Sequence, residues 1–301
     1  MKARASNLLA TAVAPAIWGS TYVVTTELLP GLSPLLVAML RALPAGLLLL
    51  LIVRQIPSGI WWLRIFILGA LNFSIFWSML FVSAYRLAGG VAATLGATQP
   101  LIVVFIAAVV LGHTVRPLSV LAAIIGLAGV ALLVLTPNAA LDMVGVAAGL
   151  AGATSMACGT VLTRKWKPPV SLLTITAWQL TAGGLLLLPV AFVANVPIPV
   201  LSATNLLGLA WLALIGAALT YLLWFRGIAR LDPTAVAPLG FLSPAVAVIL
   251  GWVLLKEALS ALQAVGFILI VGSIWLGHRT SSTAECAPAR SGDSKASADA
   301  R

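Results

Sequence analysis

Long apolar runs separated by short connections recur along this chain and constrain its fold more than any other feature. A helix needs about 20 mainly apolar residues to cross the roughly 30 Å hydrocarbon core of a bilayer. The runs are continuous rather than alternating, which disfavours a transmembrane β-barrel. The expected fold class is therefore an all-α polytopic membrane protein with ten transmembrane helices, with nine or eleven spans as alternatives. The ten runs cover about residues 8–28, 34–53, 65–84, 90–111, 118–136, 144–163, 171–194, 204–225, 235–255 and 259–277.

Composition excludes a water-soluble fold. Of the 301 residues, 61% are hydrophobic and 8% are charged, whereas about 25% of residues are charged in soluble domains. The net charge of +10 comes from basic residues scattered between apolar runs, which is typical of charges that set membrane topology rather than of a nucleic-acid-binding face. The two cysteines, Cys158 and Cys286, have no metal-binding spacing. We expect no cofactor, no metal site and no nucleic-acid partner.

The basic residues also predict the orientation of the chain. With both termini in the cytoplasm, fourteen Lys and Arg residues lie on the inner side, and only Arg86 and Lys256 lie on the outer side. Residues 278–301 are polar and cannot form a core, so we expect a disordered cytoplasmic tail. The sequence also lacks a GxxxxGK[ST] loop, so nothing indicates a nucleotide-hydrolysing module.

The sequence contains an internal repeat. Residues 84–111 align with residues 228–255 without a gap, at an offset of 144 residues. At this offset Arg86-Leu87 aligns with Arg230-Leu231, and Pro100 aligns with Pro244. Earlier in each half, at an offset of 138 residues, Arg41 lies opposite Gln179 and Gly46 lies opposite Gly184.

The repeat divides the chain into two five-span units, at residues 8–136 and 144–277. Because five is an odd number, the second unit has to enter the membrane from the opposite side, which makes the repeat inverted. Secondary transporters use this symmetry to build inward-open and outward-open states around a site at the midplane. Channels can also have inverted halves, so the repeat favours a carrier without requiring one.

The sequence resembles the drug/metabolite transporter superfamily, in particular its ten-span exporters with paired EamA-type repeats. The likeness covers about 270 residues, and this chain is most similar to the branch that exports amino acids, including aromatic ones, across the bacterial inner membrane. One departure is His113, which stands where the family often has a glutamate. The resembling motifs are Trp18-Gly19-Ser20, Arg41, Tyr85-Arg86-Leu87, Ala229-Arg230-Leu231, Gln99-Pro100, Ser243-Pro244 and Leu255-Lys256-Glu257.

Arg41 is the most distinctive candidate for a site residue, because it lies about seven residues into an apolar span. A charged side chain at that depth is costly unless it is paired or lines a wet cavity. One interpretation is a clamp for a substrate carboxylate. The alternative is a structural arginine, bonded to carbonyls of a broken helix or paired with Glu27.

Aromatic and polar residues within the spans complete the candidate substrate-binding set. Aromatic faces with few polar groups suit an amphipathic substrate, although the same rings can simply pack between helices. The candidates besides Arg41 are Trp18, Tyr22, Asn72, Trp77, Gln99, Thr220, Tyr221, Trp224 and Ser243.

Pro100 and Pro244 are candidate hinges or gates, because a proline within a helix frees a carbonyl one turn earlier; passive kinks are the alternative. No Asp or Glu lies in the middle of a span, and a proton relay usually needs one. We therefore favour flow of substrate down its own gradient, while His113 and Glu257 remain candidates for proton coupling.

The expected function is a secondary transporter that exports neutral amino acids or similar small metabolites by alternating access. The alternative is proton-coupled efflux of cationic drugs. An enzyme is disfavoured, because the sequence has no HExxH motif and no paired carboxylates within a span. The expected partners are a small-molecule substrate and the bilayer, and the chain is expected to be a monomer or a homodimer.

Overall fold

The structure is a computed structural model that describes residues 2–87, 94–112, 114–134, 142–197, 199–254 and 260–285. Two of the candidate site residues, His113 and Glu257, lie outside the described residues. The described part is helical throughout and contains no strand.

Helices in the first half of the chain follow the apolar runs. They are α1 (Lys2–Gly19), α2 (Thr21–Leu28), α3 (Pro34–Val53), α4 (Trp61–Gly69), the π-helix η1 (Ala70–Ser74), α5 (Ile75–Arg86), α7 (Gln99–Leu111) and α8 (Pro117–Val134).

The second half has a similar order of elements, with the single helix α9 where the first half has α1 and α2, and with α13 and η3 before α14. It contains α9 (Met143–Trp166), α10 (Leu172–Val193), α11 (Ala203–Ala210), the π-helix η2 (Trp211–Leu219), α12 (Thr220–Arg230), α13 (Pro233–Val236), the 3₁₀-helix η3 (Ala237–Phe241), α14 (Leu242–Leu254) and α15 (Ala261–Glu285).

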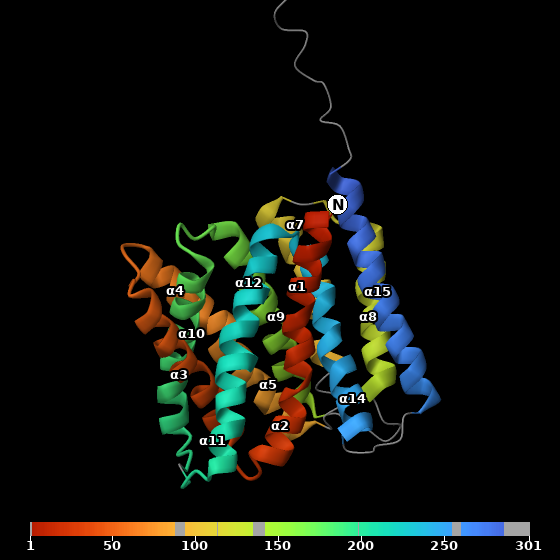
Figure 1. Ribbon diagram of the computed structural model, residues 1–301. Helices are drawn as coiled ribbons and strands as arrows, with labels where there is room; N and C mark the ends of the chain where they lie inside the picture. The colour runs from red at the N-terminus through yellow and green to blue at the C-terminus, as the bar shows by residue number, and fades with distance from the viewer. Residues whose placement is uncertain are drawn as a thin grey trace, which may run out of the picture.

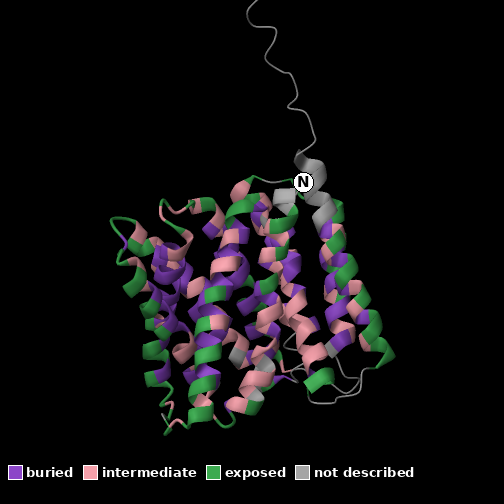
Figure 2. Ribbon diagram, in the orientation of Figure 1, coloured by how far each residue is buried: buried purple, intermediate pink, exposed green. Residues whose placement is uncertain are grey.

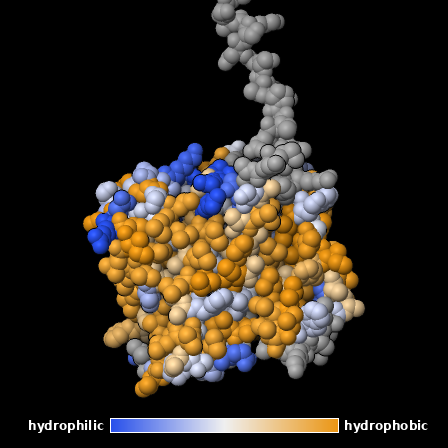
Figure 3. All heavy atoms as spheres, in the orientation of Figure 1, coloured by the Kyte–Doolittle hydropathy of each residue, from blue (hydrophilic) through white to orange (hydrophobic). Residues whose placement is uncertain are grey.

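Eight helical stretches are long and apolar enough to cross a membrane, and two shorter apolar helices, Pro117–Leu133 and Ala261–Gly277, accompany them. Figure 3 shows hydrophobic residues over most of the visible face, with hydrophilic residues gathered mainly at the end that holds the N-terminus. The prediction of an all-α membrane protein is therefore confirmed. The count of ten spans stays a prediction, because two of the ten helices are short.

The helices form a bundle in which both described ends of the chain lie at the same end (Figure 1). Buried residues gather between the helices and exposed ones on the outside (Figure 2). Large apolar side chains point outward, as at Phe192, which is 84% exposed. Such a surface suits lipid as its solvent, since lipid imposes no penalty on exposed apolar groups.

One element extends beyond its expected limit. Helix α15 continues to Glu285, into residues 278–301, for which the sequence predicts disorder. Extending an existing helix avoids the cost of nucleation, and a polar segment can therefore remain helical for a few turns. Residues 286–301 lie outside the described residues.

Contacts between the helices follow a two-fold pattern. α3 packs against α10, and α8 packs against α15 (Figure 1). α1 packs against α12 and α14, whereas α9, its counterpart in the other half, packs against α5 and α7. These contacts are paired between the two halves; the inverted arrangement of the two units stays a prediction.

Glycines allow the closest of these approaches. A Cβ atom on Gly46 of α3 would lie 2.4 Å from the backbone nitrogen of Thr181 on α10, and one on Gly184 of α10 would lie 2.7 Å from Leu43 Cα. At the other side of the bundle, a Cβ on Gly129 would lie 2.8 Å from the carbonyl oxygen of Gly266. Backbone contact of this kind is how membrane helices associate without a hydrophobic driving force.

Two further contacts exchange a glycine for a hydroxyl-bearing residue. Gly227 of α12 faces Thr11 of α1, and a Cβ on Gly227 would lie 2.5 Å from Thr11 Oγ1. In the other half, Gly149 of α9 faces Ser83 of α5, where a Cβ would lie 2.9 Å from Ser83 Oγ. The offset of 144 residues relates Ser83 to Gly227, so the hydroxyl-bearing residue of one contact corresponds to the glycine of the other.

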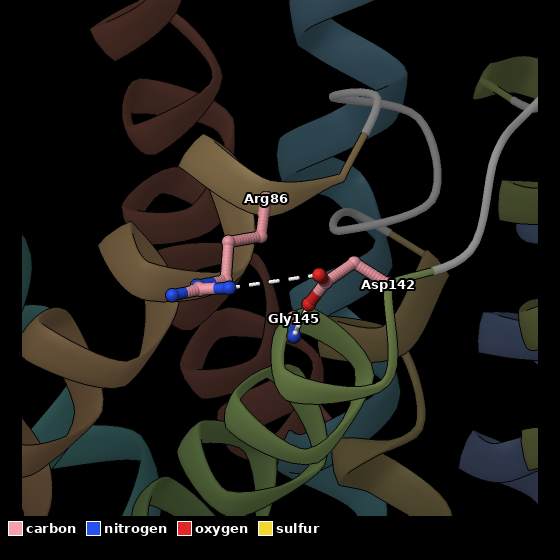
Figure 4. A network of polar contacts seen from close by, with 3 residues as sticks. All are labelled: Arg86, Asp142 and Gly145. Carbon is pink, nitrogen blue, oxygen red and sulfur yellow. Dashed lines mark hydrogen bonds and ion pairs between the residues drawn. The ribbon is translucent and has the colours of Figure 1, made fainter.

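The repeated Arg-Leu pairs end corresponding helices. Arg86 is the last residue of α5, and Leu87 leaves the helix with φ −122°; Leu231 leaves α12 with φ −116°. Arg86 Nη1 lies 3.5 Å from Asp142 Oδ2, while Asp142 Oδ1 accepts a hydrogen bond of 2.8 Å from the backbone nitrogen of Gly145 (Figure 4). Asp142 thus caps α9 and ties its start to the end of α5.

We expect Gly46→Ala to destabilise the protein by about 1–3 kcal/mol, because the added methyl group would overpack the α3–α10 contact. Thermal unfolding of the purified protein in detergent would measure the effect.

The matched control is Gly272→Ala in α15, where an added Cβ meets no atom within 4 Å. Alanine favours a helix over glycine by about 1 kcal/mol, so the control variant should be as stable as the parent or more so. Equal melting temperatures for the two variants would refute the importance of the Gly46 contact.

Candidate functional site

A cluster of aromatic rings lies at the centre of the helix bundle, between α1, η1, α5 and α12. Phe73 and Tyr221 lie closest, with ring centroids 4.5 Å apart. Trp18 lies 5.2 Å from both Tyr221 and Trp224, and Trp77 lies 5.3 Å from Phe73. We call the rings of these five residues, together with Phe225, which lies 5.7 Å from Tyr221, the aromatic cluster.

Arg41 is anchored beside the aromatic cluster. Its Nη2 donates a 2.9 Å hydrogen bond to the carbonyl oxygen of Gly216, and its Cζ lies 4.9 Å from the centroid of the Trp77 ring. Stacking on an aromatic face stabilises a guanidinium group through the ring quadrupole. Glu27 is exposed, and the described partners of Arg41 are a carbonyl and a ring. Arg41 is therefore bonded as its structural interpretation expects, with the carbonyl provided by an irregular helix.

The same carbonyl belongs to a short chain of hydrogen bonds. Thr220 Oγ1 donates to the Gly216 oxygen at 2.8 Å and accepts from Trp18 Nε1 at 2.9 Å. Arg41 of α3 and Thr220 of α12 thus bond the same carbonyl oxygen, and Trp18 of α1 is linked to it through Thr220. The rings and the guanidinium group are positioned by one connected network.

The Gly216 carbonyl lies in an irregular part of its helix. Gly216 lies in the π-helix η2, and π-helical segments occur often at functional sites. A second π-helix, η1, spans Ala70–Ser74. At the offset of 144 residues, η1 corresponds to residues 214–218, which lie within η2. The irregularity is therefore present at the same place in both halves.

The π-helix of the first half has its own buried polar contact. Asn72 Nδ2 donates a 2.8 Å hydrogen bond to Gln179 Oε1, and both side chains are completely buried. Asn72 corresponds to Gly216 in the repeat, and Gln179 corresponds to Arg41. The Asn72–Gln179 contact is thus the counterpart of the Arg41–Gly216 contact.

Several buried polar atoms around the aromatic cluster have no hydrogen-bond partner among the described residues. They are Arg41 Nε, Trp224 Nε1, Asn72 Oδ1 and Gln179 Nε2. An unpaired polar group in an apolar interior costs about 1–3 kcal/mol. These atoms are three donors and one acceptor that a polar ligand could pair.

The structure brings together six of the ten candidate substrate-binding residues around the aromatic cluster: Trp18, Arg41, Trp77, Thr220, Tyr221 and Trp224. Asn72 joins them through the adjacent Phe73 of η1. The side chain of Tyr22 lies outside the described residues. Gln99 opens α7, and Ser243 lies in the first turn of α14.

The candidate hinge prolines lie at the starts of helices. Pro100 is in the first turn of α7, directly after a turn at residues 97–98, and Pro244 is the third residue of α14, which follows η3. The irregular backbone therefore precedes each proline. A first-turn proline sacrifices no internal hydrogen bond, since the first four N–H groups of a helix have none.

Four residues of the site were absent from the candidate set: Phe73, Phe225, Gly216 and Gln179. Gly216 contributes only a backbone carbonyl, and no side-chain pattern indicates that. Gln179 did have a signal, because the repeat alignment places it opposite Arg41.

Comparison with known proteins identifies the relatives of this chain. The model of the EamA-like transporter family matches residues 5–135 and again residues 143–277. Protein PecM of Dickeya dadantii is 45% identical over 264 residues, covering 87% of this chain and 88% of PecM. A probable amino-acid metabolite efflux pump of Salmonella typhimurium is 30% identical over 147 residues, covering 45% of this chain and 49% of the pump. A solved crystal structure shares the fold with a TM-score of 0.78 at 20% identity, covering 92% of this chain and 99% of that chain.

We expect Thr220→Val to destabilise the protein by about 1–3 kcal/mol, because Trp18 Nε1 would lose its acceptor. Unfolding of the purified protein in detergent, followed by tryptophan fluorescence, would report the loss.

Thr181→Val is the matched control. Thr181 is also a buried helical threonine, but its hydroxyl has no partner among the described residues, so its loss should leave stability unchanged or raise it. Similar destabilisation by both substitutions would mean that the Trp18–Thr220 bond contributes nothing particular.

Proposed function

The chain belongs to the EamA-like transporter family, and from this premise we propose that it exports aromatic and other neutral amino acids, or similar small metabolites, across the inner membrane by alternating access. The observation that carries the proposal is the buried aromatic cluster with a single guanidinium group at its edge. The relative named as an amino-acid metabolite efflux pump supports the same substrate class.

The site suits a molecule with an apolar side chain and a carboxylate. The rings of the aromatic cluster would hold the side chain, with offset or edge-on contacts of the kind they make with one another. Arg41 would bind the carboxylate through its unpartnered Nε while Nη2 stays on the Gly216 carbonyl. A carboxylate would also neutralise a charge that is costly to bury.

The two-fold arrangement of the contacts supports alternating access. α3 meets η2 through Arg41 and Gly216, and α10 meets η1 through Gln179 and Asn72. In the proposed cycle each contact closes one side of the site, and the two open in turn as the halves rock against each other. Pro100 and Pro244 are the proposed bending points, because each keeps a helix from extending backward across the irregular segment before it.

The proposed driving force is the gradient of the substrate itself. The charged side chain that contacts the aromatic cluster is a cation, and Glu27 and Asp142, which the structure describes, lie at helix ends. Proton-coupled efflux of cationic drugs remains the second proposal, with His113 and Glu257 as its candidate coupling residues. An arginine at the site repels a cation, which favours neutral zwitterions.

We expect Arg41→Gln to raise the half-saturating concentration for labelled phenylalanine by about tenfold to a hundredfold in liposomes that contain the purified protein. A hydrogen bond to a charged group contributes about 1.5–3 kcal/mol, and each 1.4 kcal/mol corresponds to a factor of ten in affinity. Unlabelled tryptophan should compete with phenylalanine for uptake.

The control is Arg64→Gln, near the start of α4, which removes another guanidinium group stacked on tryptophan, 5.0 Å from the Trp61 ring. It should leave phenylalanine uptake unchanged. Uptake that requires an imposed pH gradient, or that favours phenethylamine over phenylalanine, would replace this proposal with proton-coupled cation efflux.

Pro100→Ala and Pro244→Ala are each expected to lower the rate of phenylalanine flux without lowering the amount of folded protein. Alanine restores a backbone donor, so α7 could extend back to the Gly96 carbonyl and stiffen the proposed bending point. Pro30→Ala, in an exposed connection, is the control. Unchanged flux in both hinge variants would contradict the hinge.

A further inference from the structure

Asn72 and Gln179 occupy the position that corresponds, in the other half, to the contact of Arg41. Arg41 lies on α3 and reaches the π-helix η2, and Gln179 lies on α10 and reaches the π-helix η1. Each pair joins a helix of one half to the π-helix of the other. The two contacts are related by the repeat, but one is charged and the other is neutral.

The two contacts approach the aromatic cluster from opposite ends of the bundle. Arg41 and Gln179 each lie seven residues after the first residue of their helix, Pro34 and Leu172, which is about 10 Å along the axis. The neighbour of Gln179, Trp178, donates a 2.7 Å hydrogen bond to the carbonyl oxygen of Gln55. Gln55 follows α3, at the end opposite its start, so Gln179 lies toward the end that holds the N-terminus (Figure 1).

The amide pair has binding capacity that the protein does not use. With Asn72 Nδ2 bonded to Gln179 Oε1, the Asn72 Oδ1 acceptor and the Gln179 Nε2 donor have no partner among the described residues. If the oxygen and nitrogen atoms of both amides were interchanged, one acceptor and one donor would again lack a partner. Both side chains are 0% exposed, so bulk solvent does not reach these atoms.

Backbone from a third helix leaves space for the amide pair. Gly159 of α9 lies against Asn72, and a Cβ at this position would be 2.1 Å from Asn72 Oδ1. Phe73, the next residue along η1, contacts Tyr221 and Trp77 in the aromatic cluster. Asn72 therefore lies between Gly159 of α9 and Gln179 of α10, one residue before a ring of the aromatic cluster.

We propose that Asn72 and Gln179 form a second polar subsite, which binds the head group of a zwitterionic substrate in the state open toward the N-terminal end. This rests on the proposed function. The Asn72 oxygen accepts from the ammonium group, and the Gln179 nitrogen donates to the carboxylate. Arg41 serves the state open toward the other end. The amide pair is uncharged, so a substrate with a net charge gains no Coulomb attraction from it. This subsite therefore selects molecules that are neutral overall.

Uptake of labelled phenylalanine into membrane vesicles of both orientations tests the proposal. Inside-out vesicles present the face that we assign to the N-terminal end, and right-side-out vesicles present the other face. Gln179→Met keeps the side-chain length and volume but removes the amide. We expect it to raise the half-saturating concentration about tenfold in inside-out vesicles and by much less in right-side-out vesicles. Arg41→Gln should show the reverse asymmetry.

Thr181→Val provides the matched control, since Thr181 lies on the same helix and is buried with an unpartnered hydroxyl; it should alter neither face. In the parent protein, 3-phenylpropionate and phenethylamine each keep only one of the two charged groups of phenylalanine. Both should compete with phenylalanine more weakly than tryptophan does at the inside-out face.

Equal effects of Gln179→Met on the two faces, or no effect on either, would overturn the subsite while leaving the transporter intact. Full-strength competition by either singly charged analogue at the inside-out face would overturn it as well, even if the variants failed to fold. If the parent protein showed no saturable uptake of any amino acid, the proposed function itself would fail, and that result is distinct from these.

Discussion

Placing one guanidinium group inside an apolar bundle is the constraint on which the centre of this structure depends. A charge at that depth needs an acceptor. The π-helix η2 provides one, because its Gly216 carbonyl accepts from Arg41 and from Thr220. Trp18 is fixed through Thr220, so the placement of the rings and the placement of the charge depend on the same peptide group.

The same arrangement shows how a duplicated fold becomes specialised. At this contact the π-helix of the first half carries an amide side chain, Asn72, whereas the π-helix of the second half has only the backbone of Gly216. The missing side chain leaves room for the longer Arg41 opposite Gly216, and the shorter Gln179 lies opposite Asn72. A symmetric scaffold therefore presents two chemically different surfaces to whatever lies between them.

Much of the fold could be predicted from the sequence, because the bilayer allows few solutions. Continuous apolar runs predict helices, and the family resemblance was correct. The site was predicted less fully. Side-chain chemistry indicated Arg41, Trp18 and Tyr221, but η1 and η2 left no mark in the composition, since a π-helix differs from an α-helix by backbone geometry alone. The partner of Arg41 is likewise a carbonyl, which every residue carries. Only the repeat alignment could have singled out Gln179.

The exchange of glycine for a hydroxyl-bearing residue between the halves has an evolutionary consequence. Gly227 accommodates Thr11, and Gly149 accommodates Ser83, so at both contacts the second half supplies the glycine and the first half supplies the hydroxyl group. A chain built by joining two copies of the first half would place a serine at the position of Gly227, where it would oppose Thr11. A gene fusion of that kind would not reproduce this protein, because its halves have diverged from interchangeable copies into obligate complements.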